Sequence, residues 1–294
     1  SLCMKRAEII DFWAMVFNPS SMIRLMHVIM GCWLAGAFFV LSVSAWYLLK
    51  RKHTDFAKSS MKVALVIALL ISLSQMFISG DMSAKIVHDH QPAKFAAMEG
   101  HWDDGPADMA ILGYIDEVNK KTVGLKIPGL TSFLIDFDPE LPVKGINSIP
   151  EDERPPLQIT FQSYHIMISI GVTLILLSLL GCYLWWRGKL FDSRKVLWMF
   201  VFSVFLPVAA NTAGWITAEV GRQPWIVYGL MKTAQGVSPN LSSDQLYFSN
   251  VLFLFLYLML FIVFIYVLNN KIKHGPESLD TLNTKSSLVE LPKR

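Results

Sequence analysis

The sequence predicts an all-α, polytopic membrane protein: a bundle of five transmembrane helices with one long loop on the outer side. The chain has 294 residues, of which 53% are apolar and only 17% are charged, and its mean hydropathy is +0.43. This composition excludes an ordinary soluble domain, a disordered chain and a small disulfide scaffold. The net charge is only +3 and no basic face stands out, so we expect no nucleic-acid partner.

The first observation behind this fold class is the set of apolar runs. A helix crosses the hydrocarbon core with about 20 predominantly apolar residues. Any single run could instead be a buried helix of a soluble protein, but several together make that alternative improbable. The runs cover residues 23–49, 63–79, 161–184, 196–218 and 250–268.

The segment before the first run, residues 1–22, is predicted to lie outside or at the membrane interface. The chain opens with Ser1, and nothing at that end resembles a signal peptide, so we expect an incomplete chain. The cysteines Cys3, Cys32 and Cys182 are not spaced as metal ligands, and the last two lie in apolar runs. The sequence therefore predicts neither a disulfide framework nor a zinc site.

The second observation is the alternation of basic loops, because Lys and Arg concentrate on the cytoplasmic side. The loop 50–62 holds five Lys or Arg residues against Asp55, and the loop 185–195 holds four against Asp192. The tail 269–294 also begins with basic residues. These three segments are predicted to be cytoplasmic, which leaves the long loop 80–160 and the shorter loop 219–249 outside. The polar tail carries no predicted chemistry.

His27 is the first polar residue that an apolar span has to accommodate. It lies about four residues below the outer end of its span, with Arg24 one turn before it and Gly31 one turn after it on the same face. A small residue beside a histidine suits a flat cofactor ligated by that histidine. A histidine hydrogen-bonded to a neighbouring helix is the alternative, and position alone favours neither.

Met167 lies about six residues below the outer end of the third span. At about 1.5 Å of rise per residue, His27 and Met167 come within roughly 3 Å of the same depth. Histidine and methionine together are an axial pair for haem iron. Packing is the ordinary role of a methionine in a chain that has 14 of them. His165 lies on a different face from Met167, so ligation by His27 and His165 is the minor alternative.

Glu219 lies at the outer end of the fourth span, close in sequence to Trp215, Arg222 and Trp225, with Pro224 ending the helix. A carboxylate at this place is either solvated or, when buried near an arginine, a plausible metal ligand or proton carrier.

Lys94 and Glu99 lie five residues apart in the outer loop and flank an apolar patch. An apolar surface with a cation and an acid suits an amphiphilic molecule with exchangeable protons. An amphipathic helix lying on the membrane is the alternative, and spacing alone favours it.

Taken together, four motifs resemble those of subunit I of cytochrome bd-type quinol oxidases, over residues 12 to 276. The run Gly221-Arg222-Gln223-Pro224-Trp225 after Glu219 is similar to the family's signature. The stretches 17–47, 94–99 and 165–167 resemble its fifth transmembrane helix, its quinol loop and its seventh helix.

The resemblance implies roles for these residues. His27 and Met167 match the axial ligands of the low-spin haem b, and Glu219 matches the ligand of the high-spin haem b, with Trp215 beside it. Arg222 and His165 fall at positions beside these haems, where some members carry arginine in place of His165. Lys94 and Glu99 match residues of quinol oxidation.

The resemblance also implies an activity and an assembly. The implied reaction is quinol:oxygen oxidoreduction in a bacterial cytoplasmic membrane, with electrons passing through the haems b to haem d. Members of the family begin with four further helices that carry the ligand of haem d. We therefore expect a fragment or a split subunit, active with that N-terminal half and with subunit II and small subunits. The rival classes are a b-type cytochrome without oxidase activity and a transporter, although a transporter is expected to show internal repeats, and we see none.

Overall fold

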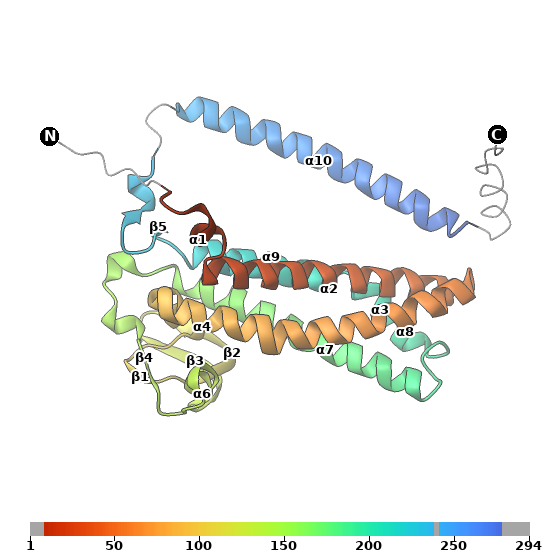
Figure 1. The fold of residues 1–294 in the computed structure, drawn as a ribbon, viewed down its shortest axis with the longest axis horizontal. Coiled ribbons are helices and arrows are strands. Elements are labelled where there is room, and N and C mark those ends of the chain that lie inside the picture. Colours follow the sequence, from red (N-terminus) through yellow and green to blue (C-terminus); the bar gives the residue numbers. More distant parts are fainter. Residues whose placement is uncertain (1–8, 238–240, 278–294) are drawn as a thin grey trace.

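The computed structural model describes residues 9–237 and 241–277. Cys3 and residues 278–294 of the predicted tail lie outside the described residues. Within them, five helices are long and apolar enough to cross a membrane, which confirms the predicted fold class. Figure 1 shows the spanning helices packed side by side, except for the last one, with small strands gathered at one end of the bundle.

The helices are longer than the apolar runs, because a helix continues past the membrane interface. The helices are α1 (Phe12–Val16), α2 (Pro19–Lys50), α3 (Thr54–Ser74), α4 (Asp81–His90), α5 (Pro92–Glu99), α6 (Leu130–Asp136), α7 (Leu157–Trp186), α8 (Arg194–Phe202), α9 (Phe205–Val220) and α10 (Ser243–His274). The second span joins α3 to α4 through a π-helical turn, η1 (Gln75–Gly80), and so reaches His90 rather than Ser79.

Local sequence explains several helix ends. The side chain of Asn18 caps α2 by accepting a hydrogen bond from Ser20 N at 2.9 Å, and Pro19 occupies the first turn, where its missing N–H costs nothing. The fourth span is divided into α8 and α9. Pro207 lies in the first turn of α9, so it cannot donate to the carbonyl group four residues before it, and the helix is interrupted there.

The loops 80–160 and 219–249 contain short antiparallel strands, which the sequence did not predict. The strands are β1 (Gly105–Pro106), β2 (Met109–Asp116), β3 (Lys121–Ile127), β4 (Pro142–Val143), β5 (Trp225–Val227) and β6 (Met231–Lys232). They pair as β1 with β4, β2 with β3, and β5 with β6. The hairpin β2–β3 lies against α7, where Gln162 Nε2 donates to Gly113 O at 2.8 Å.

The core of the bundle lies between α2, α3, α7 and α8. Large apolar side chains fill it, and Phe38, Leu41, Met61, Leu65 and Phe200 are fully buried. Polar links cross between helices: Ser42 Oγ of α2 donates to Val201 O of α8 at 2.7 Å, and the hydroxyls of Ser163 and Thr217 join α7 to α9 at 2.7 Å. Close packing and such hydrogen bonds stabilise helix pairs where lipid removes the hydrophobic driving force.

α10 lies apart from the other helices, across the top of the view in Figure 1. None of its membrane-spanning window is buried. Its contact with the bundle is at its end, where Tyr47 Oη donates to Ile272 O at 2.7 Å.

Gly181 provides a test of this helix packing. A Cβ atom at this position of α7 would lie 2.6 Å from Leu65 Cδ1 and 2.8 Å from Phe200 Cζ. Overpacking a filled core costs about 1–3 kcal/mol, so Gly181→Ala is expected to lower the thermal unfolding temperature of the purified protein in detergent. Gly36→Ala is the matched control, because nothing lies within 4 Å of its added Cβ. Equal unfolding temperatures for the two variants would contradict the packing described here.

Candidate functional site

The helix α5 carries both Lys94 and Glu99, and it is buried rather than lying on the membrane. Every residue from Ala93 to Glu99 is buried, so the alternative of an amphipathic surface helix is wrong for this chain. The cause is tertiary: α5 packs against α7 and α4. Lys94 is 7% exposed and Glu99 only 4% exposed. A buried cation and a buried acid on one short helix need specific partners.

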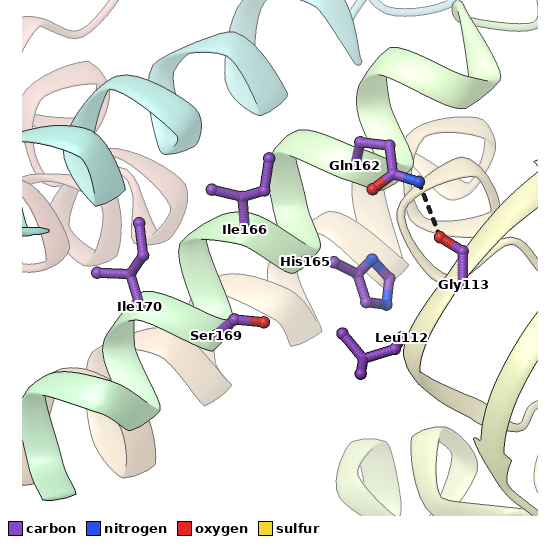
Figure 2. Close-up of a pocket in the computed structure, with 7 residues that line it drawn as sticks. All are labelled: Leu112, Gly113, Gln162, His165, Ile166, Ser169 and Ile170. Carbon is purple, nitrogen blue, oxygen red and sulfur yellow. Dashed lines mark hydrogen bonds between the residues drawn. The ribbon is translucent and has the colours of Figure 1, made fainter.

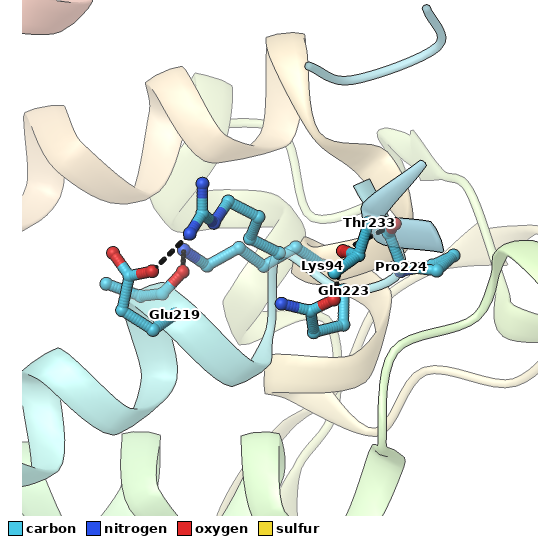
Figure 3. A network of polar contacts seen from close by, with 7 residues as sticks. Lys94, Glu219, Gln223, Pro224 and Thr233 are labelled. Atoms are coloured by element: carbon cyan, nitrogen blue, oxygen red, sulfur yellow. Dashed lines mark hydrogen bonds and ion pairs between the residues drawn. The ribbon is translucent and has the colours of Figure 1, made fainter. Parts of the chain in front are cut away.

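Lys94 reaches the end of α9. Its Nζ lies 3.4 Å from Ala218 O, and Figure 3 shows it extending toward Glu219. Burial is the main cause that lowers the pKa of Lys94 to about 8, followed by the charge of Arg24, while Glu219 partly opposes the shift. Arg222 adds a further positive charge. Two further cations, Arg24 and Arg222, and the carboxylate of Glu219 therefore act on Lys94 at this end of the bundle.

Glu219 forms an ion pair with Arg222, but its side chain is 54% exposed. Of the two interpretations of Glu219, the solvated carboxylate is therefore the one that fits the described residues. Trp215, one turn earlier on the same face of α9, is 59% exposed. This face has room for a group that neither the bundle nor the strands fill. The Nε of Arg222 is buried and has no hydrogen-bond partner among the described residues.

The residues that follow Arg222 are held by the small hairpin β5–β6. Thr233 Oγ1 donates to Gln223 Oε1 at 2.6 Å, and Thr233 N donates to Pro224 O at 2.8 Å (Figure 3). Trp225 is buried at the start of β5. This hairpin fixes the backbone just beyond α9 and thereby the position of the Glu219–Arg222 pair.

Glu99 lies on the opposite side of α5 from Lys94, in a polar cluster of its own. Thr131 Oγ1 of α6 donates to Glu99 Oε2 at 3.0 Å, and the hydroxyl of Tyr164 on α7 also hydrogen-bonds to this carboxyl group. Burial raises the pKa of Glu99, while the nearby His165 and the two hydroxyls partly counteract the shift. The structure thus places Lys94 and Glu99 in different surroundings, on two sides of α5.

His165 is buried and held on both sides of its ring. Its Nδ1 lies 2.8 Å from Phe161 O and its Nε2 lies 2.7 Å from Ala110 O of β2, and the ring stacks on Phe161. Figure 2 shows His165 between α7 and the hairpin, beside Leu112 and Gly113, in a cavity of about 310 Å³. Both ring nitrogens are therefore already engaged by the backbone.

His27 is hydrogen-bonded to the neighbouring span, as one of its two interpretations predicts. Its Nδ1 lies 3.2 Å from Ser79 Oγ, and its Nε2 lies 3.1 Å from Gln75 Nε2. Both partners belong to the π-helical turn η1. Metal-bound histidines are commonly oriented through a hydrogen bond on the other ring nitrogen. Ser79 can provide that bond on Nδ1, so the arrangement also fits a ligand through Nε2 after Gln75 turns away.

Neighbouring contacts place His27 and Met167 at almost the same level of the bundle. Gly31, four residues below His27, contacts Asn211 of α9, whose Nδ2 lies 3.4 Å from Gly31 O. Gly214, three residues later on the antiparallel α9, packs against Met167, with its added Cβ 3.0 Å from the sulfur. The path from His27 to Met167 therefore goes four residues along α2 to Gly31 and three residues back along α9 to Gly214. His27 and Met167 differ in level by one residue of rise, about 1.5 Å.

The residues that the sequence analysis missed are those that orient the charged groups. Gln75 and Ser79 hold His27, whereas Thr131 and Tyr164 hold Glu99. Single polar residues such as these are common in any loop or span, so no pattern distinguished them. Among the described residues, no group of three or more His, Cys, Asp or Glu side chains could hold a metal ion alone.

Comparisons with known proteins agree on one family. The family described as cytochrome bd terminal oxidase subunit I matches residues 2–276. Cytochrome bd ubiquinol oxidase subunit 1 of Bacillus subtilis (strain 168) is 39% identical over 284 residues, covering 92% of this chain and 60% of that protein. Cytochrome bd-II ubiquinol oxidase subunit 1 of Escherichia coli (strain K12) is 27% identical over 344 residues, covering 94% of this chain and 66% of that protein.

A solved structure shows the same fold. The structure of bd oxidase from Geobacillus thermodenitrificans is similar with a TM-score of 0.80 and 32% sequence identity, covering 90% of this chain and 61% of the other. The chain thus spans about three-fifths of the length of the B. subtilis relative and of this solved chain.

Proposed function

The chain belongs to the cytochrome bd terminal oxidase subunit I family, and from this membership we propose that it is a haem-bearing part of a quinol:oxygen oxidoreductase. The proposal has quinol oxidised at the outer membrane face and its electrons passed through two haems b to haem d, where oxygen is reduced to water. The main support for this proposal is that His27 on α2 and Met167 on α7 lie at almost the same level of the bundle.

His27 and Met167 would hold the low-spin haem b. A nitrogen donor and a thioether form an axial pair that favours reduced iron. Ser79 would fix the histidine ring through Nδ1, and Gly214 leaves space beside the methionine sulfur. The bound haems supply one-electron transfer between quinol and oxygen. His165 is the weaker candidate ligand, because a bond to iron would break one of its two backbone hydrogen bonds.

Glu219 would hold the high-spin haem b, with Trp215 on the same open face of α9. The pair with Arg222 orients the carboxylate. Arg222 and Lys94 together place positive charge beside it, which suits acidic groups on the cofactor.

Lys94 and Glu99 would serve quinol oxidation from the two sides of α5. Quinol releases two protons as it is oxidised, so a site for it needs groups that accept them. Burial disfavours the charged form of Glu99 and raises its pKa, which favours its taking up a proton from quinol. Lys94 retains a charge that can orient a quinol oxygen below about pH 8.

A spectrum tests the proposal directly. We expect the reduced-minus-oxidised optical difference spectrum of the complete complex that contains this chain to show both haems b. A purified complex that shows no haem b signal, although it comes from cells that make haem, would contradict the proposal. One low-spin signal without the high-spin one would instead indicate a b-type electron carrier.

Membrane orientation gives a second, independent prediction. The basic loops predict a C-terminus in the cytoplasm and a loop between α5 and α7 that lies outside. A reporter fused after Arg294 is expected to be active in the cytoplasm, and one inserted at Gly145 is expected to be active outside. The reverse pattern would place the quinol loop on the wrong side and remove the proposed outer release of protons.

A further inference from the structure

The hydroxyl group of Thr131, on α6, has two acceptors within reach but only one hydrogen to donate. Its Oγ1 lies 3.0 Å from Glu99 Oε2 and 3.2 Å from Asp108 O. A threonine hydroxyl donates one hydrogen and can accept others, whereas a backbone carbonyl oxygen only accepts. Thr131 is buried, so bulk water does not compete for this hydrogen. The hydroxyl therefore donates either to the carboxyl group of Glu99 or to Asp108 O.

The neighbours of Thr131 hold it in this position. The hydroxyl of Ser132, the next residue of α6, accepts a hydrogen bond from Ala107 N at 2.8 Å. Gly129 N, just before α6, donates to the side chain of Asp108 at 3.1 Å. These two hydrogen bonds fasten α6 to the segment that contains Asp108. Both acceptors of the Thr131 hydroxyl therefore stay within reach when its hydrogen turns from one to the other.

The charge of Glu99 decides which acceptor the hydroxyl uses. An ionised carboxylate can only accept, and it is a stronger acceptor than a neutral carbonyl group, so Thr131 then donates to Glu99. A protonated carboxyl group has an O–H that needs an acceptor of its own. Thr131 Oγ1 can accept that hydrogen while its own hydrogen turns to Asp108 O. Both states leave the hydroxyl and the carboxyl group hydrogen-bonded, as buried polar groups require.

The other groups that act on Glu99 come from α7. The hydroxyl of Tyr164 hydrogen-bonds to the carboxyl group, and the charge of His165 favours its ionised form. Both ring nitrogens of His165 are already bonded to backbone carbonyls, so this side chain acts on Glu99 through space. Of these three groups, Thr131 is the one whose hydroxyl reaches a second acceptor in the part of the chain that the structure describes.

We propose that Thr131 is a positioning residue whose hydroxyl changes its acceptor from Glu99 to Asp108 O when Glu99 takes up a proton. The hydroxyl thereby stabilises the buried carboxylate and still provides an acceptor for the protonated form. This inference rests on the proposed role of Glu99 in quinol oxidation. Because only an ionised Glu99 can accept a proton, Thr131 extends the pH range over which Glu99 is ready to do so.

Infrared difference spectroscopy of the complete complex, titrated with pH, tests the proposal without relying on activity. The C=O stretching band of protonated Glu99 is the band that Glu99→Gln removes. Thr131→Val keeps the shape of the side chain but loses the hydroxyl. Its band is expected at higher frequency and to persist to a pH about one unit higher, because the carboxylate has lost a donor. Thr131→Ser should restore both properties. Thr160→Val is the matched control, since Thr160 is also buried and its hydroxyl donates to Pro156 O at 2.8 Å.

The rate of quinol oxidation against pH is the second measurement. The rate should rise with pH as Glu99 ionises, and in Thr131→Val this rise should lie about one pH unit higher, which makes the variant about tenfold slower at a given pH within it. Thr131→Ala, which also lacks the hydroxyl, serves if the valine variant does not fold. An unchanged Glu99 band in a folded variant without the hydroxyl, or a serine variant that behaves like the valine one, would overturn the proposal. A shifted band together with a parental rate in Glu99→Gln would support the change of acceptor and contradict the role of Glu99 in quinol oxidation.

Discussion

Replacing His27 with alanine is expected to remove the low-spin haem b from the complex. Histidine is the stronger of the two proposed ligands, and its hydrogen-bond partners in η1, Gln75 and Ser79, offer only weaker donors. The reduced low-spin band in membranes that contain the complete complex measures the outcome. The band should fall to background while the protein remains in the membrane.

Met167→Leu tests the second proposed ligand of the low-spin haem b. Leucine keeps nearly the same volume and apolarity, so the packing of α7 on α9 should survive. The haem is expected to stay on His27, but the iron should turn high-spin and its potential should fall, because the thioether that favours reduced iron is lost.

His165→Ala serves as the control for both variants. Two residues along a helix turn the side chain by about 200°, and His165 faces Ala110 of β2 whereas Met167 packs on Gly214 of α9. The low-spin band should therefore remain. Loss of the band in His165→Ala, with an intact band in Met167→Leu, would replace the His–Met pair with ligation by His27 and His165.

Changing Glu99 is expected to slow quinol oxidation at least tenfold with little change in haem content. Glu99→Ala removes the carboxyl group, whereas Glu99→Gln keeps hydrogen bonds to Thr131 and Tyr164 but cannot exchange a proton. If Glu99 acts by exchanging a proton, both variants should oxidise quinol equally slowly. A glutamine variant that matches the parent rate would reduce Glu99 to a structural role.

Lys94 should affect the same reaction with a distinct pH dependence. Lys94→Ala is expected to slow quinol oxidation while leaving the haem spectrum intact. In the parent protein Lys94 has a pKa of about 8, so it is charged below that pH and loses its charge above it. Its contribution should therefore decline as the pH rises through 8, and the rate of Lys94→Ala should not show that decline. Identical pH profiles would exclude a role for the charge.

The five spans could be predicted from sequence alone, because hydropathy is a local sum over about 20 residues and needs no knowledge of neighbours. The level of His27 and Met167 could also be estimated, since rise per residue is constant in a helix. The contacts of Gly31 with Asn211 and of Gly214 with Met167 give nearly the same depth.

Only the tertiary structure decided the surroundings of the charged residues. Lys94 meets Ala218, 124 residues away, and Glu99 meets Thr131 from a helix in the outer loop. The spacing of Lys94 and Glu99 indicated a surface helix, yet α5 is buried, because segments distant in sequence pack around it. For Glu219 the sequence left a solvated and a buried carboxylate open, and the structure shows a side chain that is 54% exposed on α9. Burial is a property of the whole fold, since it depends on which distant segments cover a residue, whereas periodicity and hydropathy report only what adjacent residues share.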